Sequence, residues 1–133
     1  MEKIFELLPD FYRGATPLEK EFVRLKKTIP FEISPDYLEF MKNFDGGEGT
    51  VGEKYLAIWN INDVLKTSQF YKKEDSIFHE NYFVFGSNSG IFTYAFNKKN
   101  GEIEELDLYE MDYKRTMGTD IESLIIKLMS EPL

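Results

Sequence analysis

The most constraining feature of the sequence is residues 34–52, which have the pattern of a helix that runs into a cluster of glycines. The Ser34 hydroxyl can accept a hydrogen bond from an amide of the first turn, and Pro35 suits the first helical position because no amide is needed there. Either Gly46 or Gly47 can adopt the left-handed conformation that ends such a helix. Apolar side chains recur at i, i+3, i+4 and i+7 along one face: Tyr37, Phe40, Met41 and Phe44. We therefore expect a helix that packs inward, followed by a turn.

This segment resembles the SUKH superfamily, the proteins related to the yeast cell-wall-synthesis regulator. The second helix of that superfamily reads roughly Leu-Pro-x-Asp-Tyr-x-x-Phe-Leu and leads into an Asn-Gly-Gly turn, in which Asp45 here replaces the asparagine. Further similarity lies at residues 11–15, 55–59 and 85–90, so the resemblance spans residues 11–129. We assign a structural role to six of the matching residues: Tyr37, Phe40, Gly46, Gly47, Trp59 and Gly86.

The resemblance implies a function in protein binding. Bacterial members of the superfamily typically act as immunity proteins that bind and neutralise toxins, many of them nucleases, while the yeast relative is a regulatory scaffold. Neither role requires catalysis, so the resemblance predicts no active site.

Length and composition favour one independently folding domain over residues 1–133. A chain of this length buries roughly two-thirds of the surface of its unfolded state. The absence of cysteine excludes disulfides and thiolate metal sites. The first 13 residues lack the pattern of a signal peptide, and no run approaches the ~20 apolar residues of a membrane span. We expect a cytoplasmic protein that does not bind membranes.

The net charge of −8 is concentrated in the last quarter of the chain. Residues 100–133 contain three basic and nine acidic side chains. Such a balance repels phosphate backbones and anionic lipids, so the sequence predicts no nucleic-acid partner. A basic protein partner is electrostatically favoured.

Periodicity predicts an α+β fold, with two N-terminal helices and a C-terminal helix packed on an antiparallel or mixed β-sheet. We expect a helical turn within residues 1–8 and helices over residues 17–29, 35–44, 63–71 and 120–128. We expect strands at residues 55–59, 82–85, 91–96 and 103–109, with a hairpin turn at residues 98–101. Thr16 with Glu19, and Thr119 with Glu122, have the spacing of capping boxes, and Pro30 is expected to end the first long helix.

No candidate motif for catalysis, a cofactor or a metal is complete in this sequence, because each one lacks a required residue. His79 is the single histidine and has no cysteine to share a metal. The segment 86–90 has the glycine spacing of a nucleophile elbow, but its central residue is Asn88, so we interpret it as a turn. Residues 47–52 have phosphate-loop spacing, but Glu53 stands where the lysine is required. We predict no catalytic, cofactor or metal site.

One acidic segment stands out as a candidate for partner binding. Residues 102–112 contain six acids and no base: Glu102, Glu104, Glu105, Asp107, Glu110 and Asp112. In a strand, Glu105, Asp107 and Tyr109 point to one face, and Leu106 and Leu108 to the other. The sequence therefore predicts one acidic face and one buried face.

Two interpretations of the acidic face remain open. It is either a solvated surface that protects an exposed strand from aggregation, or a docking surface for a basic protein such as a toxin domain. In the second case Tyr109 and Tyr113 supply aromatic anchors. Reversing Glu105 and Asp107 to lysine is then expected to weaken binding and to leave the melting temperature nearly unchanged.

The sequence as a whole favours an immunity protein that blocks a nuclease-type toxin by stoichiometric binding. An intracellular regulatory adaptor is the alternative binding role. A hydrolase that uses unrecognised carboxylates is the least favoured reading. The sequence leaves the oligomeric state and the identity of the toxin open.

Overall fold

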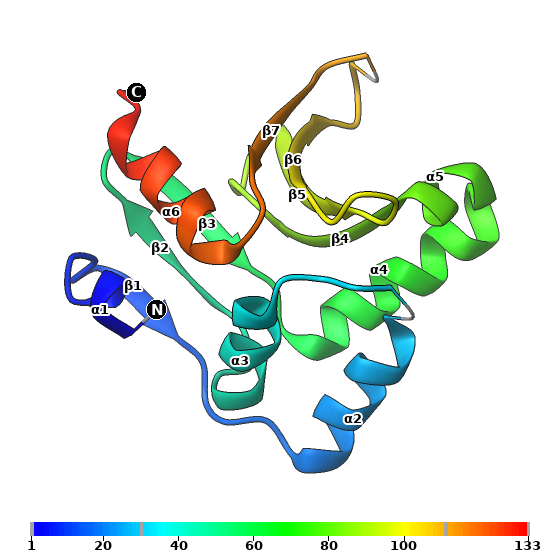
Figure 1. The fold of residues 1–133 in the computed structure, drawn as a ribbon, viewed down its shortest axis with the longest axis horizontal. Helices are drawn as coiled ribbons and strands as arrows, with labels where there is room; N and C mark the ends of the chain where they lie inside the picture. Colours follow the sequence, from blue (N-terminus) through cyan, green and yellow to red (C-terminus); the bar gives the residue numbers. More distant parts are fainter. Residues whose placement is uncertain (1, 30, 111, 133) are drawn as a thin grey trace.

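The computed structural model describes residues 2–29, 31–110 and 112–132, which form an α+β fold (Figure 1). Its helices are α1 (Glu2–Phe5), α2 (Glu19–Thr28), α3 (Pro35–Asn43), α4 (Ile61–Glu74), α5 (Ser76–Asn81) and α6 (Ile121–Ser130). Its strands are β1 (Phe11–Arg13), β2 (Gly47–Val51), β3 (Lys54–Ile58), β4 (Tyr82–Ser87), β5 (Phe92–Asn97), β6 (Ile103–Asp107) and β7 (Lys114–Gly118).

The strands form one sheet in which spatial order follows chain order from β1 to β7. Every neighbouring pair is antiparallel, so the sheet is antiparallel and not mixed. The junction between β3 and β4 is short, with only Ala57 opposite Ser87 and Ile58 opposite Gly86. The connection between these two strands runs through α4 and α5. In Figure 1 the part of the sheet from β4 to β7 curls strongly.

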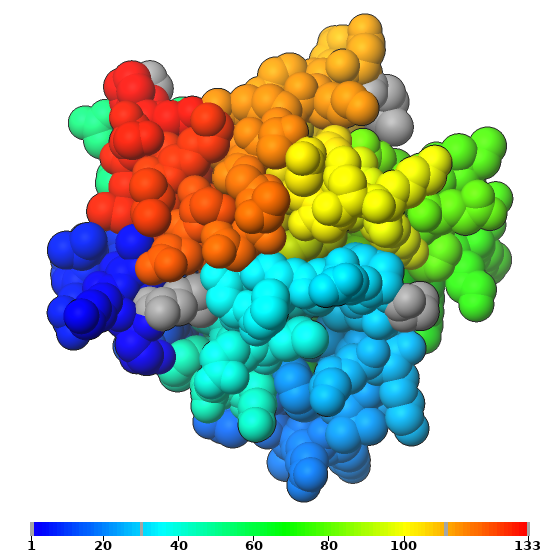
Figure 2. All heavy atoms as spheres, viewed as in Figure 1, coloured from blue at the N-terminus to red at the C-terminus, as the bar shows by residue number. Residues whose placement is uncertain are grey.

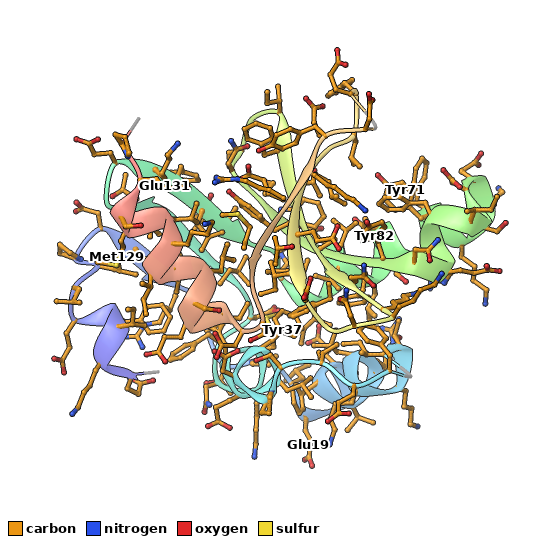
Figure 3. The ribbon with its side chains drawn as sticks, turned by 45° about the horizontal axis from the view of Figure 1, so that its top comes forward. Glu19, Tyr37, Tyr71, Tyr82, Met129 and Glu131 are labelled. Carbon is orange, nitrogen blue, oxygen red and sulfur yellow. The ribbon has the colours of Figure 1, made fainter. Side chains whose placement is uncertain are left out.

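The main core lies between one face of the sheet and the helices α3 and α6, and it extends to buried side chains of α1, α2 and α4. Tyr37 is fully buried, and its ring packs edge-on against Phe85 and Phe96, with centroids 5.4 and 5.3 Å away. Its hydroxyl has no hydrogen-bond partner among the described residues, and burial raises the pKa of this phenol. Figure 3 places Tyr37 where α3 meets the sheet. Phe40, on the same helix, is also buried in this core.

A second, smaller apolar cluster covers the opposite face of β4, β5 and β6. Phe78 of α5 packs there against Val84, Ala95 and Leu106. Tyr71 and Tyr82 flank Phe78, with ring centroids 4.6 and 5.2 Å from its own, and both lie on this side of the sheet in Figure 3. β6 is thus an interior strand with packing on both faces, and all five of its residues are buried.

The helix caps differ from those predicted. Ser34 precedes α3 but accepts no cap bond, and its hydroxyl instead donates to Asp36 Oδ1 at 2.6 Å. Asp36 in turn accepts hydrogen bonds from the first amides of α6, Ile121 N at 2.9 Å and Glu122 N at 3.0 Å. The capping box of α6 lies one residue later than predicted and joins Asp120 to Ser123. The two helices are therefore tied together by a carboxylate at their N-termini.

The predicted capping box at Thr16 is also wrong. Its hydroxyl donates to the carbonyl of Asn43 at 2.9 Å, and α2 begins at Glu19 without a side-chain cap. α2 ends at Thr28, and Pro30, which was expected to stop it, lies outside the described residues.

The glycines after α3 bring two backbone segments close together. Gly46 has a φ of +79°, the left-handed conformation that was expected of it or its neighbour. Gly47 is already the first residue of β2, and a Cβ there would lie 2.5 Å from the carbonyl oxygen of Tyr12 in β1. Gly47 is required because β1 and β2 could not otherwise pair at this point, and Gly46 because its φ is positive and a Cβ would lie 2.7 Å from the carbonyl oxygen of Ile58.

Candidate functional site

The structure buries half of the acidic segment that was predicted to form a surface. The exposed fractions are 5% for Glu104, 2% for Glu105 and 9% for Asp107. The expectation of one exposed acidic face is therefore wrong, both as a solvated surface and as a docking surface for these three residues. The reason is that β6 is an interior strand paired with the unpredicted β7, and that neighbouring side chains pack on both of its faces.

Glu105 lies at the centre of a buried polar network. It accepts hydrogen bonds from the hydroxyls of Tyr94 at 3.0 Å and Tyr113 at 2.9 Å, and from Arg115 Nε at 3.0 Å. Arg115 also donates to both carboxylate oxygens of Glu131, at 2.6 and 2.8 Å, next to the C-terminal end of α6 (Figure 3). Burial and the neighbouring Glu105 raise the pKa of Tyr94, while the bonds to Arg115 lower the pKa of Glu131. These contacts link β5, β6 and β7 to α6.

The other two buried carboxylates also have structural partners. Glu104 accepts hydrogen bonds from the Tyr82 hydroxyl at 2.9 Å and from Asn97 Nδ2 at 2.8 Å. Burial and the bond to Glu104 raise the pKa of Tyr82 to about 12. Asp107 accepts from the backbone amides of Tyr109 at 2.9 Å and Glu110 at 3.0 Å, which starts the turn after β6.

The remaining predicted partner-binding residues are separated by the length of β6. Glu102 is half-buried at the start of the strand. Tyr109, Glu110 and Asp112 are exposed in the β6–β7 loop, residues 108–113, of which Met111 lies outside the described residues. Tyr109 has an exposed fraction of 87%, and Figure 2 shows this loop projecting at the top of the molecule. A role for these four residues in partner binding stays a prediction.

A different cluster of carboxylates surrounds a hollow of about 380 Å³ beside the first three strands, which we call the acidic hollow. Its side chains include two aromatic rings, Tyr12 and Trp59, and three carboxylates, Asp45, Glu48 and Asp63. Its other lining residues are Gly14, Gly46, Gly47, Ala57, Ile58, Asn60, Ser87 and Ser89, and none of the described lining residues carries a positive charge.

The elements around the acidic hollow fix two of its carboxylates. Asp45 follows α3 and accepts a hydrogen bond from Ile61 N, the first residue of α4, at 2.8 Å. Glu48 on β2 accepts from the Tyr55 hydroxyl of β3 at 2.6 Å. Asp63 lies exposed in the first turn of α4.

Such a site suits a cationic side chain. A lysine or arginine can pair with the carboxylates and stack on an aromatic ring at the same time. Sequence reasoning gave Gly46, Gly47 and Trp59 a structural role and missed Tyr12, Asp45, Glu48 and Asp63. The sequence offered one signal for this site, namely Asp45, the aspartate that replaces asparagine before Gly46 and Gly47. Its carboxylate adds a negative charge to a turn beside an aromatic residue.

The described residues contain neither a cluster of metal ligands nor a membrane-spanning helix. No group of three or more His, Cys, Asp or Glu side chains there is arranged to hold a metal ion. Within the same residues, no helix combines the length and the apolar character needed to cross a membrane.

Comparison with known proteins identifies the family. No curated protein matches the chain. The model of the SMI1 / KNR4 family (SUKH-1) matches residues 16–126, a range that extends from the segment before α2 into α6 and includes most of the acidic hollow. The chain belongs to the SMI1 / KNR4 family (SUKH-1).

Proposed function

We propose that this protein is an immunity protein that binds a cognate nuclease-type bacterial toxin one-to-one and blocks it without catalysis. Membership of the SUKH-1 family is consistent with an immunity-like or regulatory protein-binding domain. The acidic hollow is the observation that carries the proposal, because its charge and shape suit a basic protein partner. We further propose that the chain acts as one domain in the cytoplasm of the toxin-producing bacterium.

The chemistry of the hollow complements that of a nuclease. A nuclease binds the phosphate backbone through lysine and arginine side chains, and most of its affinity for nucleic acid comes from these charges. The carboxylates Asp45, Glu48 and Asp63 can occupy the same cations, while Tyr12 and Trp59 provide the aromatic contact typical of interface hot spots. The net charge of −8 increases the rate of encounter with a basic toxin.

The β6–β7 loop is proposed as a second contact. The large side chain of Tyr109 is exposed, and Glu110 and Asp112 add two negative charges beside it. Together with the hollow, such a loop can contribute to an interface of about 1,600 Å² in total. Because charged pairs at the rim are screened by ions, the complex should weaken as the salt concentration rises.

The test begins with the purified protein as bait in a lysate of the producing organism, at low and at high salt. We expect one basic protein to be retained near one-to-one, and its nuclease activity to disappear when one equivalent of the purified protein is added. Retention of several housekeeping proteins that are lost on washing would contradict the immunity function and would indicate a regulatory adaptor instead.

A matched pair of charge reversals tests the hollow itself. Asp63 and Glu19 are both exposed acids in the first turn of a helix, but only Asp63 lines the acidic hollow, and Glu19 lies on α2 (Figure 3). We expect Asp63→Lys to raise the Kd for the toxin at least tenfold, equivalent to about 1.4 kcal/mol, and Glu19→Lys to change it less than threefold. Equal effects of the two variants would show that the hollow is not the contact.

A further inference from the structure

A second hollow, about 380 Å³ in volume, carries the opposite charge. It is lined by residues of α2, α4 and α5 and of the turn after β5, and Figure 1 shows α4 next to both α2 and α5. We call it the basic hollow. Its lining residues are Arg24, Lys27, Thr28, Leu65, Ser68, Gln69, Lys72, His79 and Lys98, so it contains four cationic side chains and a histidine, and none of its described lining residues is an acid.

These cations form no ion pair of their own among the described residues, although Glu80 partly offsets the lowering of the Lys98 pKa by burial. The ion pairs found there use Arg13 and Arg115, and none involves a cation of the basic hollow. Lys98 is only partly exposed, and its ammonium donates to the backbone carbonyl of His79, which leaves two of its three donors available. Such a concentration of positive charge in a chain of net charge −8 suits an anionic ligand.

The pKa of His79 shows that two of these cations act on the same side chain. Its pKa is lowered by burial and, next, by Lys98 and Lys72, while Glu80 acts in the opposite direction. The positive charges of Lys72 on α4 and Lys98 after β5 therefore both act on the imidazole of His79 on α5. An anion seated among these groups would be attracted by all of them at once.

We propose that the basic hollow binds a small phosphate-bearing molecule, with Arg24, Lys27, Lys72 and Lys98 contacting its phosphate oxygens. The volume is within the range of about 300–1,000 Å³ that is typical of small-molecule sites. Arg24 can bind a phosphate through two parallel hydrogen bonds, and the lysines can act as point charges. Polymeric nucleic acid is disfavoured because the whole chain, with its charge of −8, repels a long polyanion.

Because His79 is a single histidine in the basic hollow, NMR can report binding of an anion there directly. His79 is the single histidine of this sequence, so the NMR spectrum contains one set of imidazole resonances, from the Hδ2 and Hε1 protons of one ring. We would titrate inorganic pyrophosphate against sodium chloride of equal ionic strength. Because a bound anion favours the imidazolium form, we expect pyrophosphate to raise the pKa of His79 and to shift its resonance with saturation, and chloride to do neither. An unchanged resonance with millimolar pyrophosphate would overturn the proposal.

Two variants on α4 provide the control. Lys72 lines the hollow and Lys66 does not, and both are exposed on the same helix. We expect Lys72→Glu to raise the Kd for pyrophosphate at least tenfold, the loss of about one charge-assisted hydrogen bond, and Lys66→Glu to change it less than threefold. Equal effects would mean that only the overall charge matters, which contradicts a site.

A second arm of the titration separates two sources of the phosphate group. Adenosine diphosphate carries the same diphosphate as pyrophosphate with a nucleoside attached. Equal affinity for both would identify a site for the phosphate group alone, whereas tighter binding of adenosine diphosphate would identify a nucleotide site. Either result supports phosphate binding, and the absence of binding in both arms refutes it.

Discussion

Reversal of the buried charge at Glu105 is the sharpest test of the fold around the acidic segment. The side chain of Glu105 is 3% exposed and accepts hydrogen bonds from Tyr94, Tyr113 and Arg115. In Glu105→Lys, an ammonium would face the Arg115 guanidinium at the position where a carboxylate oxygen now lies 3.0 Å from Arg115 Nε. The buried Tyr94 hydroxyl would also lose its acceptor.

The loss of stability in Glu105→Lys is the sum of these two changes, the broken ion pair and the unpaired hydroxyl. Leaving a buried hydroxyl without an acceptor costs about 1–3 kcal/mol, and breaking a buried ion pair by changing one partner costs about 3–5 kcal/mol. Arg115 keeps Glu131 and is about one-third exposed, which reduces the second figure. We therefore expect Glu105→Lys to lower the free energy of unfolding by about 4 kcal/mol, and the melting temperature by about 15 °C.

Circular dichroism during thermal and urea denaturation measures both quantities. Glu110→Lys is the matched control, because it makes the same change of charge on an exposed side chain of the neighbouring loop. We expect it to shift the melting temperature by less than about 2 °C. A similarly small shift for Glu105→Lys would refute the burial of this carboxylate and would restore the exposed acidic face that the sequence suggested.

Three further predictions concern single side chains. Tyr37→Phe should raise the free energy of unfolding by about 1 kcal/mol in urea denaturation, because its buried hydroxyl has no partner among the described residues; a loss of stability would show that this hydroxyl is bonded in solution. Gly46→Val should cost at least about 3 kcal/mol in the same assay, because the φ of +79° is strained for valine and its Cβ would lie 2.7 Å from the carbonyl oxygen of Ile58; wild-type stability would contradict the left-handed turn. The pKa of Tyr82 is raised from 10.0 to about 12, so its contribution to stability is complete below pH 10 and is lost as pH rises through 12. Urea midpoints measured across this range should fall less steeply in Tyr82→Phe than in the wild type, and parallel curves would contradict the raised pKa that burial and the bond to Glu104 give this phenol.

The sequence was a good guide where local patterns decide the structure. The stripe of Tyr37 and Phe40 gave α3 and its buried face, and the turn at Asn100 and Gly101 gave the β5–β6 hairpin. Both depend on residues only a few positions apart, which is the range over which helix periodicity and turn chemistry act.

The unpredicted elements lack such a local signal. β2 begins Gly47-Glu48-Gly49, a composition that favours a turn, and it forms a strand by pairing with β1, whose close approach these glycines permit. β7 reads as polar, with only Met117 of its five residues buried. Because β7 was missed, β6 was taken for an exposed strand.

The burial of Glu105 could have been anticipated in part. The hairpin register places Tyr94 opposite Glu105, so the predicted turn already put a hydrogen-bond donor beside this carboxylate. The second partner, Arg115, is ten residues further on and belongs to the missed strand β7. Charged residues are buried only when paired, so without that partner the sequence favoured exposure.

The acidic hollow could not be assembled from the sequence at all. Its carboxylates Asp45, Glu48 and Asp63 and its aromatic residues Tyr12 and Trp59 come from three separate stretches of the chain, at residues 12, 45–48 and 59–63. They meet because β1 pairs with β2 and α4 starts beside the turn at Asp45.

The short junction between β3 and β4 has a consequence for the order of folding. The pairs β2–β3, β4–β5, β5–β6 and β6–β7 are each joined by a loop or a tight turn, and hairpins between sequence neighbours close at low entropic cost. β1 and β2 are joined by a longer segment that contains α2 and α3. β3 and β4 share only two residue pairs across a connection that contains two helices. We expect the hairpins from β4 to β7 to form one cooperative unit, and the strands β2 and β3 another. Amide hydrogens on the two sides of the junction should then exchange at two distinct rates, with the boundary between Ile58 and Gly86.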